Sequence, residues 1–294
     1  MASISIVIVA YNSGELLRRC LAAVGSGHGE VVVVDNGPAA GEHDVAGETV
    51  RLIRRSNNDG FGSAANAGVA ASSGRWVLLL NPDAWPIEDG IERLVEFAAG
   101  HPGLGAAGPC LFDPAGQPQR STIRPPLGAA PLAVWVAFPH AVTGLYGAWR
   151  RATSVVRRRR VRPTEFLQGS VLLVRRDAFD QVGGFDERFF MYGEDADLCA
   201  RLRDAGWGVE LCSSARFVHV GGGSTGSESD RMQFELLRSW LRLIAKHKGI
   251  REAERARRWT LRAVRARALA SPRRRPVARW LASGTARELL GLPE

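Results

Sequence analysis

The sequence has few of the features that mark exported or disulfide-bonded proteins. It contains four cysteines in 294 residues (Cys20, Cys110, Cys199 and Cys212), and no two of them form a C-x-x-C pair. This usage is typical of reduced cysteines in a cytosolic protein. The apolar run at residues 4–10 has neither a basic leader nor a cleavage site. We therefore expect a strand there and not a signal peptide.

A long unbroken apolar run is also missing. Residues 126–149 carry no charged side chain and are followed by Arg150, Arg151 and the arginines at 157–160. Their length alone would allow a membrane span, but prolines and glycines interrupt them. We expect an insertion folded over the core. The alternatives are a helical flap at the membrane interface and a true span, which the breaks disfavour.

Acidic residues are outnumbered, which gives a formal net charge of +9 and a sequence pI near 10.3. Such a balance indicates anionic partners: nucleotide phosphates, nucleic acid or anionic lipid. The basic residues gather at 157–160 and in the C-terminal third, so the charge belongs to an appendage. At 45% hydrophobic residues, the remainder is long and apolar enough for one large α/β domain.

Strand-like and helix-like segments alternate through the first hundred residues. Strands are expected at 4–9, 30–34, 50–54 and 75–80, and helices at 15–24, 61–71 and 87–99. This alternation predicts right-handed βαβ units and a parallel sheet, which binds ligands at the carboxyl ends of its strands. The polar residues expected at those ends are Tyr11, Asn12, Asp35, Asn36, Asn81 and Asp83.

The later part predicts further elements. We expect strands at 104–111, 165–174 and 208–212, a loop at 113–124, an amphipathic helix at 228–248 and an Arg-rich helix at 251–268. The expected division is a catalytic domain over 1–226, with a variable insertion at about 126–163, and an Arg-rich helical region over 227–294.

An acidic cluster at the start of a predicted helix is the strongest candidate for catalysis. Gly193 is followed by Glu194, Asp195 and Asp197 in the first turn of a helix of about 12 residues. Such acids can simply cap the helix, and Asp197 has Arg201 four residues on for a surface ion pair. Glu194 and Asp195 are less well explained by capping and suit a general base. On the residues alone both interpretations remain open.

Several motifs taken together resemble the family-2 glycosyltransferases of the GT-A fold, and most closely their bacterial rhamnosyltransferase branch. The pieces occur in the family's order and cover roughly residues 4–223. They are IVIVAYN, VVVVDN, NNDGFGSAANAG, LLLNPDA, LQGSVLLVRRDAFDQVGGFDERFFMYGEDADLCAR and a following His219. The resemblance implies a GT-A-type, Rossmann-like α/β fold, with a mostly parallel sheet, flanking helices and a helical C-terminal appendage.

The resemblance also implies inverting transfer from a nucleotide-diphosphate sugar. Asp195 matches the family's catalytic base. Asp83 matches the metal-binding acid of its D-x-D signature, with Asn81 in place of the first acid. His219 matches a position that completes the Mg²⁺ or Mn²⁺ site in some members. Residues placed near the acceptor or diphosphate are Gln168, Gly169, Glu194 and Arg201; the donor-binding set is Ala10, Tyr11, Asn12, Asp35, Asn36, Asn58, Gly60, Phe61, Asn66, Asn81 and Asp83.

The branch implies dTDP-L-rhamnose as donor and a glycan or polyprenyl-linked acceptor, in the synthesis of cell-envelope polysaccharide. Another UDP-, GDP- or dTDP-sugar is the alternative donor. The protein is expected in the cytoplasm, in peripheral contact with the inner face of the cell membrane, and without a nucleic-acid partner.

Three other functions are considered as alternatives. Residues 60–65 fit a G-x-G-x-x-A dinucleotide fingerprint, but residues 56–59 separate them from the preceding strand, which disfavours an NAD(P)-dependent oxidoreductase. A basic nucleic-acid- or membrane-binding module would fit the Arg-rich tail, but the sequence contains no recognition helix typical of DNA binding and no RNP motif typical of RNA binding. A glycosidase is disfavoured because adjacent acids do not supply carboxyls about 5–9 Å apart across a bond. Taken singly, Asp83 could be a turn acid and His219 a strand histidine.

Overall fold

The structure is a computed structural model that describes residues 3–25, 27–37, 50–138, 166–221, 229–270 and 274–292. The chain divides into two compact units. The first comprises Met1–Arg124 and Arg157–Ser229, and the second comprises Pro125–Val156 and Asp230–Glu294.

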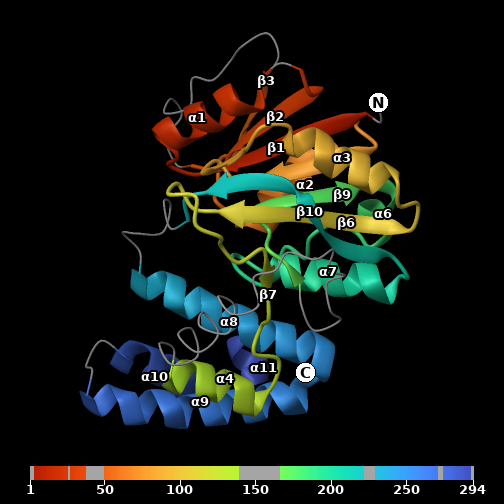
Figure 1. The fold of residues 1–294 in the computed structure, drawn as a ribbon. Helices are drawn as coiled ribbons and strands as arrows, with labels where there is room; N and C mark the ends of the chain where they lie inside the picture. Colours follow the sequence, from red (N-terminus) through yellow and green to blue (C-terminus); the bar gives the residue numbers. More distant parts are fainter. Residues whose placement is uncertain are drawn as a thin grey trace. The chain divides into compact units, whose positions relative to one another are not determined.

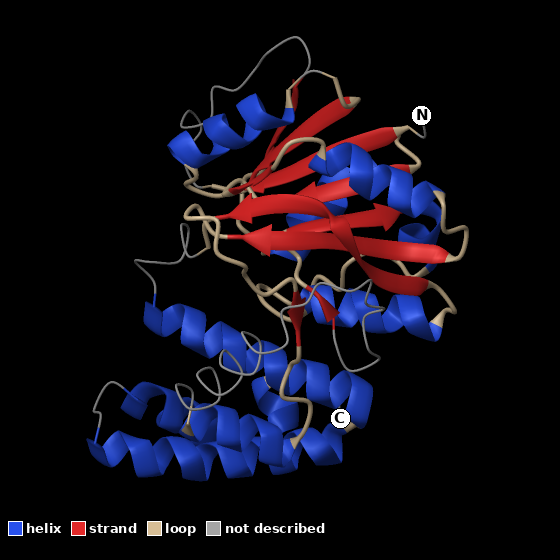
Figure 2. Cartoon of the chain, viewed as in Figure 1, coloured by secondary structure: helices blue, strands red, loops and turns tan. Residues whose placement is uncertain are grey.

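The first unit is built on an eight-stranded sheet in the order β3-β2-β1-β4-β9-β6-β10-β5 (Figures 1 and 2). A second sheet pairs β7 with β8. The strands are β1 (Ile4–Ala10), β2 (Glu30–Asp35), β3 (Val50–Arg54), β4 (Trp76–Leu80), β5 (Ala84–Pro86), β6 (Leu104–Phe112), β7 (Thr122–Ile123), β8 (Phe166–Leu167), β9 (Val171–Arg175) and β10 (Gly208–His219).

The first four strands of this sheet are parallel, as the alternating pattern predicted. They are rich in valine, isoleucine and leucine, and β1, β2 and β4 are buried almost throughout, as expected for strands covered on both faces. The expectation of a parallel sheet fails at β9, which lies antiparallel between β4 and β6. Nothing in its own apolar sequence could reveal that direction, because strand direction depends on the route of the chain before it.

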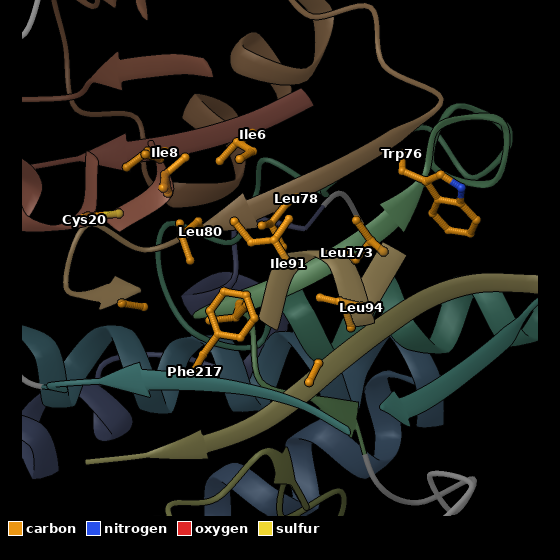
Figure 3. Close-up of a cluster of buried hydrophobic side chains, with 14 of the residues drawn as sticks. Ile6, Ile8, Cys20, Trp76, Leu78, Leu80, Ile91, Leu94, Leu173 and Phe217 are labelled. Carbon is orange, nitrogen blue, oxygen red and sulfur yellow. The ribbon is translucent and has the colours of Figure 1, made fainter. Parts of the chain in front are cut away.

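Helices cover both faces of the sheet. They are α1 (Gly14–Val24), α2 (Phe61–Ala70), α3 (Gly90–Ala99), α6 (Arg176–Gln181) and α7 (Glu194–Asp204). Helices α1 and α3 share one core with the strand residues beneath them, and Figure 3 shows Ile8, Leu80, Ile91 and Phe217 in that layer. Helix α2 lies on the opposite face, where Gly68 allows it to approach β1 and β2 closely.

Two strand predictions need correction. The segment expected as one strand at 165–174 is split into β8 and β9 by a turn at 168–170. The short strand expected at 208–212 is the first part of β10, which continues past a bulge between Cys212 and Arg216 as far as His219. Strand β5 was not predicted, because three residues carry too little pattern.

The second unit is helical. It contains α4 (Ala129–Ala137), α8 (Ser229–Lys248), α9 (Ile250–Ala270), α10 (Arg275–Ala282) and α11 (Ala286–Leu289) around a separate apolar core. The apolar segment was expected to fold over the catalytic core, but its described part, α4, packs inside this unit against α9. Residues 139–165, including the arginines at 157–160, lie outside the described residues. Within the described helices, none combines the length and apolarity needed to cross a membrane.

Candidate active site

The ends of β1 and β2 lie side by side. Ala10 is paired with Asp35 in the sheet, and the backbone N–H of Asn36 donates to the Ala10 carbonyl at 2.8 Å. Asn12 has a left-handed φ of 48°, which turns the chain sharply after β1. A Cβ placed on Gly37 would lie 3.6 Å from Asn12 Oδ1, so the two loops are in contact. Four of the predicted donor residues are therefore neighbours.

A second loop joins this group. Asn36 Nδ2 donates to Asn58 Oδ1 at 2.8 Å, and the same Asn58 oxygen accepts from the Gly60 amide at 3.1 Å. Asn36 Oδ1 is buried and has no hydrogen-bond partner among the described residues. A buried acceptor without a partner is costly in a folded protein and suits a ligand that donates a hydrogen bond.

Gly60 and Phe61 connect this loop to the acidic stretch. The Phe61 amide donates to the Phe190 carbonyl at 3.1 Å. Gly60 has φ +99°, and a Cβ on it would clash with that same carbonyl, so only glycine fits. Asn66 is fully engaged nearby: Nδ2 donates to Phe185 O and to Glu187 Oε1, and Oδ1 accepts from Phe185 N. These hydrogen bonds hold α2 to residues 185–187. Contact of Asn66 with the donor remains a prediction.

The structure brings Asp83 and His219 together. Asp83 follows β4 and precedes β5, which pairs antiparallel with the end of β10 in the register His219 to Ala84. The His219 Nε2 and Asp83 Oδ1 atoms are 3.6 Å apart, too far for a hydrogen bond. Burial lowers the pKa of His219 and outweighs the opposing effect of Asp83. The pair therefore offers a carboxylate and a neutral imidazole, both of which bind divalent cations.

Gln119 is a residue of this site that the sequence did not reveal. Its Nε2 donates to the His219 carbonyl at 2.8 Å, and its Oε1 lies 3.3 Å from His219 Nδ1. If Nδ1 carries the proton, it donates to Gln119 and leaves the Nε2 lone pair facing Asp83. Gln119 lies in the predicted loop 113–124, a hundred residues from His219, and no motif marked it.

Asp195 occupies the first turn of α7. Tyr192 and Gly193 before it have left-handed φ values of 67° and 87°, and this turn sets the direction in which the helix begins. A left-handed tyrosine costs about 1–2 kcal/mol, a strain typical of functional sites. Asp195 Oδ2 accepts from the Gly169 amide at 3.0 Å, and Oδ1 accepts from Ala196 N at 2.7 Å.

The turn at 168–170 connects Asp195 to the end of β4. Gly169 donates to Asp195, and the neighbouring Ser170 carbonyl accepts from the Asn81 amide at 2.9 Å. A Cβ on Gly169 would lie 3.2 Å from Asp195 Cβ, so a small residue allows this approach. The backbone N–H of Gln168 donates to the Ser121 carbonyl at 3.1 Å.

Glu194 and Asp195 form a buried, interacting pair. Burial, and then the charge of Asp195, raises the pKa of Glu194 to about 8, and burial raises the pKa of Asp195. Glu194 Oε2 is buried without a hydrogen-bond partner in the described part of the chain. Two amides donate to Asp195, which favours its ionised form. A neutral Glu194 beside an anionic Asp195 is therefore the favoured arrangement near neutral pH.

The predicted surface pair of Asp197 and Arg201 is instead an ion pair around a buried carboxylate. The Asp197 side chain is fully buried, and Arg201 Nε donates to its Oδ2 at 2.7 Å. Arg201 Nη1 also donates to Val182 O at 2.7 Å. These contacts hold α7 against the 182–184 turn. They support the expectation that Asp197 has a structural role, and the predicted role of Arg201 near the diphosphate remains untested.

Comparison with known sequences finds similar glycosyltransferases. The family model described as "Glycosyl transferase family 2" matches residues 5–183, and one described as "N-terminal domain of galactosyltransferase" matches residues 153–221. The chain is 34% identical over 279 residues to N-acetylglucosaminyl-diphospho-decaprenol L-rhamnosyltransferase of Mycobacterium tuberculosis, covering 87% of this chain and 88% of that protein. It is 25% identical to the low-salt glycan biosynthesis hexosyltransferase Agl10 of Haloferax volcanii, covering 74% and 66%.

Solved structures show the same fold. The mannosyltransferase PcManGT of Pyrobaculum calidifontis, in complex with GDP-Man and Mn²⁺, superposes with a TM-score of 0.57 at 18% identity and covers 98% of this chain and 78% of that one. GalNAc-T7, with UDP, GalNAc and Mn²⁺, gives a TM-score of 0.59 at 13% identity and covers 100% and 55%. The predicted GT-A-type fold is confirmed. From its sequence motifs, its sheet and the match over residues 5–183, the chain belongs to glycosyltransferase family 2.

Proposed function

We propose that this glycosyltransferase moves L-rhamnose from dTDP-L-rhamnose, with inversion, onto a sugar linked through a diphosphate to a polyprenol. One observation carries the proposal: the identity of 34% to the mycobacterial L-rhamnosyltransferase extends over 87% of this chain. The match therefore includes sequence from both units. A protein that shared only the donor fold would match the first unit alone.

The base in this reaction is Asp195. Its carboxylate takes the proton of the acceptor hydroxyl while that oxygen bonds to C1 of the donor sugar. The bond from C1 to the diphosphate oxygen breaks, and the dTDP leaves with the electron pair. Glu194 remains protonated beside it, so the negative charge that attracts the proton resides on Asp195. The amides of Gly169 and Ala196 hold the carboxylate in one orientation.

The donor nucleotide would lie over the ends of β1 and β2. Asp35, Asn12 and Tyr11 would bind base and ribose there, and Asn36 Oδ1, a buried acceptor without a partner among the described residues, would take a hydrogen bond from the ligand. Gly60 and Phe61 lie between this group and the Phe190 carbonyl. The first unit alone thus supplies every proposed donor and catalytic residue.

Asp83 and His219 would hold Mg²⁺ or Mn²⁺, since ligand distances of about 2.1 Å allow two donor atoms of one cation to stand up to about 4 Å apart. Their separation of 3.6 Å satisfies this limit. Within the described residues no third acid, histidine or cysteine joins them. When bound, the cation neutralises charge on the leaving diphosphate. Peripheral contact with the inner face of the cell membrane would bring the enzyme to a lipid-linked acceptor.

A donor and acceptor screen tests the proposal. Purified protein is given dTDP-L-rhamnose, UDP-sugars or GDP-sugars with a polyprenyl-diphosphate N-acetylglucosamine acceptor in detergent, with and without Mn²⁺ or Mg²⁺. We expect rhamnosylated lipid with dTDP-L-rhamnose. A UDP- or GDP-sugar that reacts more than about tenfold faster, a difference of about 1.4 kcal/mol in barrier, would replace the proposed donor.

A further inference from the structure

A basic hollow lies on the helical unit, and none of the residues that line it takes part in the proposed reaction. Its volume is about 580 Å³, and the side chains around it come from the start of α9 and from α11. Four are arginines (Arg251, Arg255, Arg258 and Arg287), and Thr285 and Glu254 complete its polar lining. Four positive charges against one negative charge make this hollow suited to an anion.

The acids of α9 are occupied in holding the unit together. Glu254 accepts two hydrogen bonds from Arg257, at 2.9 and 2.6 Å, and a third from the Ala286 amide at 2.8 Å. Glu252 accepts from the Ala129 amide at 2.9 Å and so holds the first turn of α4. These bonds fix α4 and α11 on either side of α9. Glu254 Oε1 also lies 3.5 Å from Arg258 Nε, so its single charge is shared between Arg257 and Arg258. The four arginines that line the hollow still outnumber this one acid.

The basic character continues along the helix. Arg251, Arg255, Arg258 and Arg262 lie within about 60° of one another around the α9 axis, and all four are exposed. Trp259 lies at the edge of this stripe and is 45% exposed. Around the α9 axis, the Trp259 side chain points about 20° away from that of Glu252, whose carboxylate accepts a hydrogen bond from α4. The arginine stripe and the edge facing α4 are therefore adjacent.

The exposed face of α4 is apolar. It presents Ala130, Pro131 and Val134, followed by Phe138. Among the described residues, the exposed large hydrophobic side chains are Val134, Phe138 and Trp259, and all three belong to this unit. Apolar and indole side chains beside arginines suit the boundary between lipid headgroups and acyl chains. A nucleic acid would bind the arginines through its phosphates but would leave the apolar face of α4 exposed to water, whereas a bilayer would cover both.

We propose that this hollow is a phosphate site for the headgroup of an anionic phospholipid, and that the α9 stripe and the α4 face dock the helical unit on the bilayer. Arg251, Arg258 and Arg287 would bind the phosphate oxygens. Val134, Phe138 and Trp259 would enter the interfacial layer. This inference rests on the proposed function only for the lipid nature of the acceptor.

The test compares two arginine pairs of the helical unit. Arg251→Gln/Arg258→Gln removes two of the four positive charges of the hollow, whereas Arg275→Gln/Arg279→Gln removes the same charge from exposed positions of α10 that belong neither to the hollow nor to the α9 stripe. Arg255, which pairs with Glu252 at 2.7 Å, stays in place. Binding is measured by sedimentation with phosphatidylcholine vesicles containing one part in three of phosphatidylglycerol. Thermal unfolding checks that both variants fold.

Each basic residue near an anionic surface contributes about fivefold to binding, so the hollow pair should bind about 25-fold more weakly. We expect the α10 pair to lose clearly less, and its loss to vanish at high salt, where diffuse attraction is screened. Equal losses in the two pairs, or no loss in the hollow pair, would overturn the proposal. Release of the wild-type protein from vesicles by millimolar inorganic phosphate would assign the hollow to a free anion instead. If the wild-type protein bound a single-stranded oligonucleotide more tightly than the vesicles, the hollow would be assigned to nucleic acid.

Transfer to an acceptor dispersed in detergent separates this inference from the proposed function. The hollow pair should keep wild-type turnover there and lose it only with acceptor in vesicles. An absence of rhamnosyl transfer by the wild-type protein in detergent would count against the proposed function and leave the vesicle result standing.

Discussion

The two adjacent acids at the start of α7 differ in their surroundings. Asp195 accepts hydrogen bonds from two backbone amides, whereas Glu194 Oε2 has no partner among the described residues. This difference, and not their position in the sequence, assigns the charge to Asp195 and the proton to Glu194.

Asp195→Asn should lower single-turnover sugar transfer by about 100- to 10,000-fold and leave donor affinity near that of the wild type. The new amide nitrogen would face one of two backbone N–H groups, so a stability loss of about 1–3 kcal/mol is also expected. Rates are therefore compared below the unfolding transition. Glu194→Gln and Asp197→Asn serve as comparisons. If Glu194→Gln alone is inactive, the base has been wrongly assigned.

The stability of the fold should depend on pH through Glu194. Its pKa is raised from 4.5 to about 8 by burial, so the folded chain keeps this proton while the unfolded chain releases it. The free energy of unfolding of the wild type should therefore fall, relative to Glu194→Gln, as pH rises from about 4.5 to 8, and then level off. Urea unfolding across this range measures the difference. Parallel profiles for the two proteins would contradict the assignment.

Gln119 should affect metal binding by holding the His219 ring in one orientation. Gln119→Leu removes both hydrogen bonds to that residue and should weaken Mn²⁺ binding by about 10- to 100-fold, the usual effect of removing a group that orients a ligand. The measurement is electron paramagnetic resonance of free Mn²⁺ during titration, which needs no turnover. Gln117→Leu, an exposed change in the same loop, is the control. Equal affinity in both variants would show that Gln119 does not position His219.

At the scale of elements, the loop before α2 depends on a close backbone contact. Gly60→Ala should destabilise the first unit by about 2–4 kcal/mol, because its φ of +99° and the Phe190 carbonyl both exclude a Cβ. Gly116→Ala also has a positive φ, 77°, but nothing lies within 4 Å, so it should cost about 1 kcal/mol. Urea midpoints compare the two. Similar midpoints would mean that the loop before α2 shifts freely.

The elements themselves were largely predictable. Hydrophobic runs and their spacing located β1, β2, β4 and the helices α2 and α7, because burial on a sheet or on a helix face imposes a period on the sequence. The same signal missed β5, α10 and α11, which span at most eight residues. It also gave no direction for β9, since an apolar strand has the same composition in either direction.

At the scale of the whole molecule, the helical unit combines two distant segments. A chain ending at Ser229 would retain α4 and lose the helix α9 that covers it. Leu132 and Val136, now buried, should then cause aggregation. Leu132→Gln/Val136→Gln should improve the solubility of the shortened chain, yet destabilise the full chain by several kcal/mol. Light scattering and thermal unfolding measure these effects. If the two substitutions improved the behaviour of both chains, or impaired both, the pairing of α4 with α9 would be contradicted.

Local sequence patterns were enough to identify the family, the α/β class and the main candidate residues, including Asp83, Asp195 and His219. These depend on local patterns: buried strands, polar residues that follow them, and acids in a first helical turn. The tertiary structure decided which of these residues meet. It brought Gln119 to His219 and Gly169 to Asp195, and it placed α4 against α9. Such contacts join residues 26 to about 130 positions apart, and they depend on strand order and chain route, which no local pattern encodes.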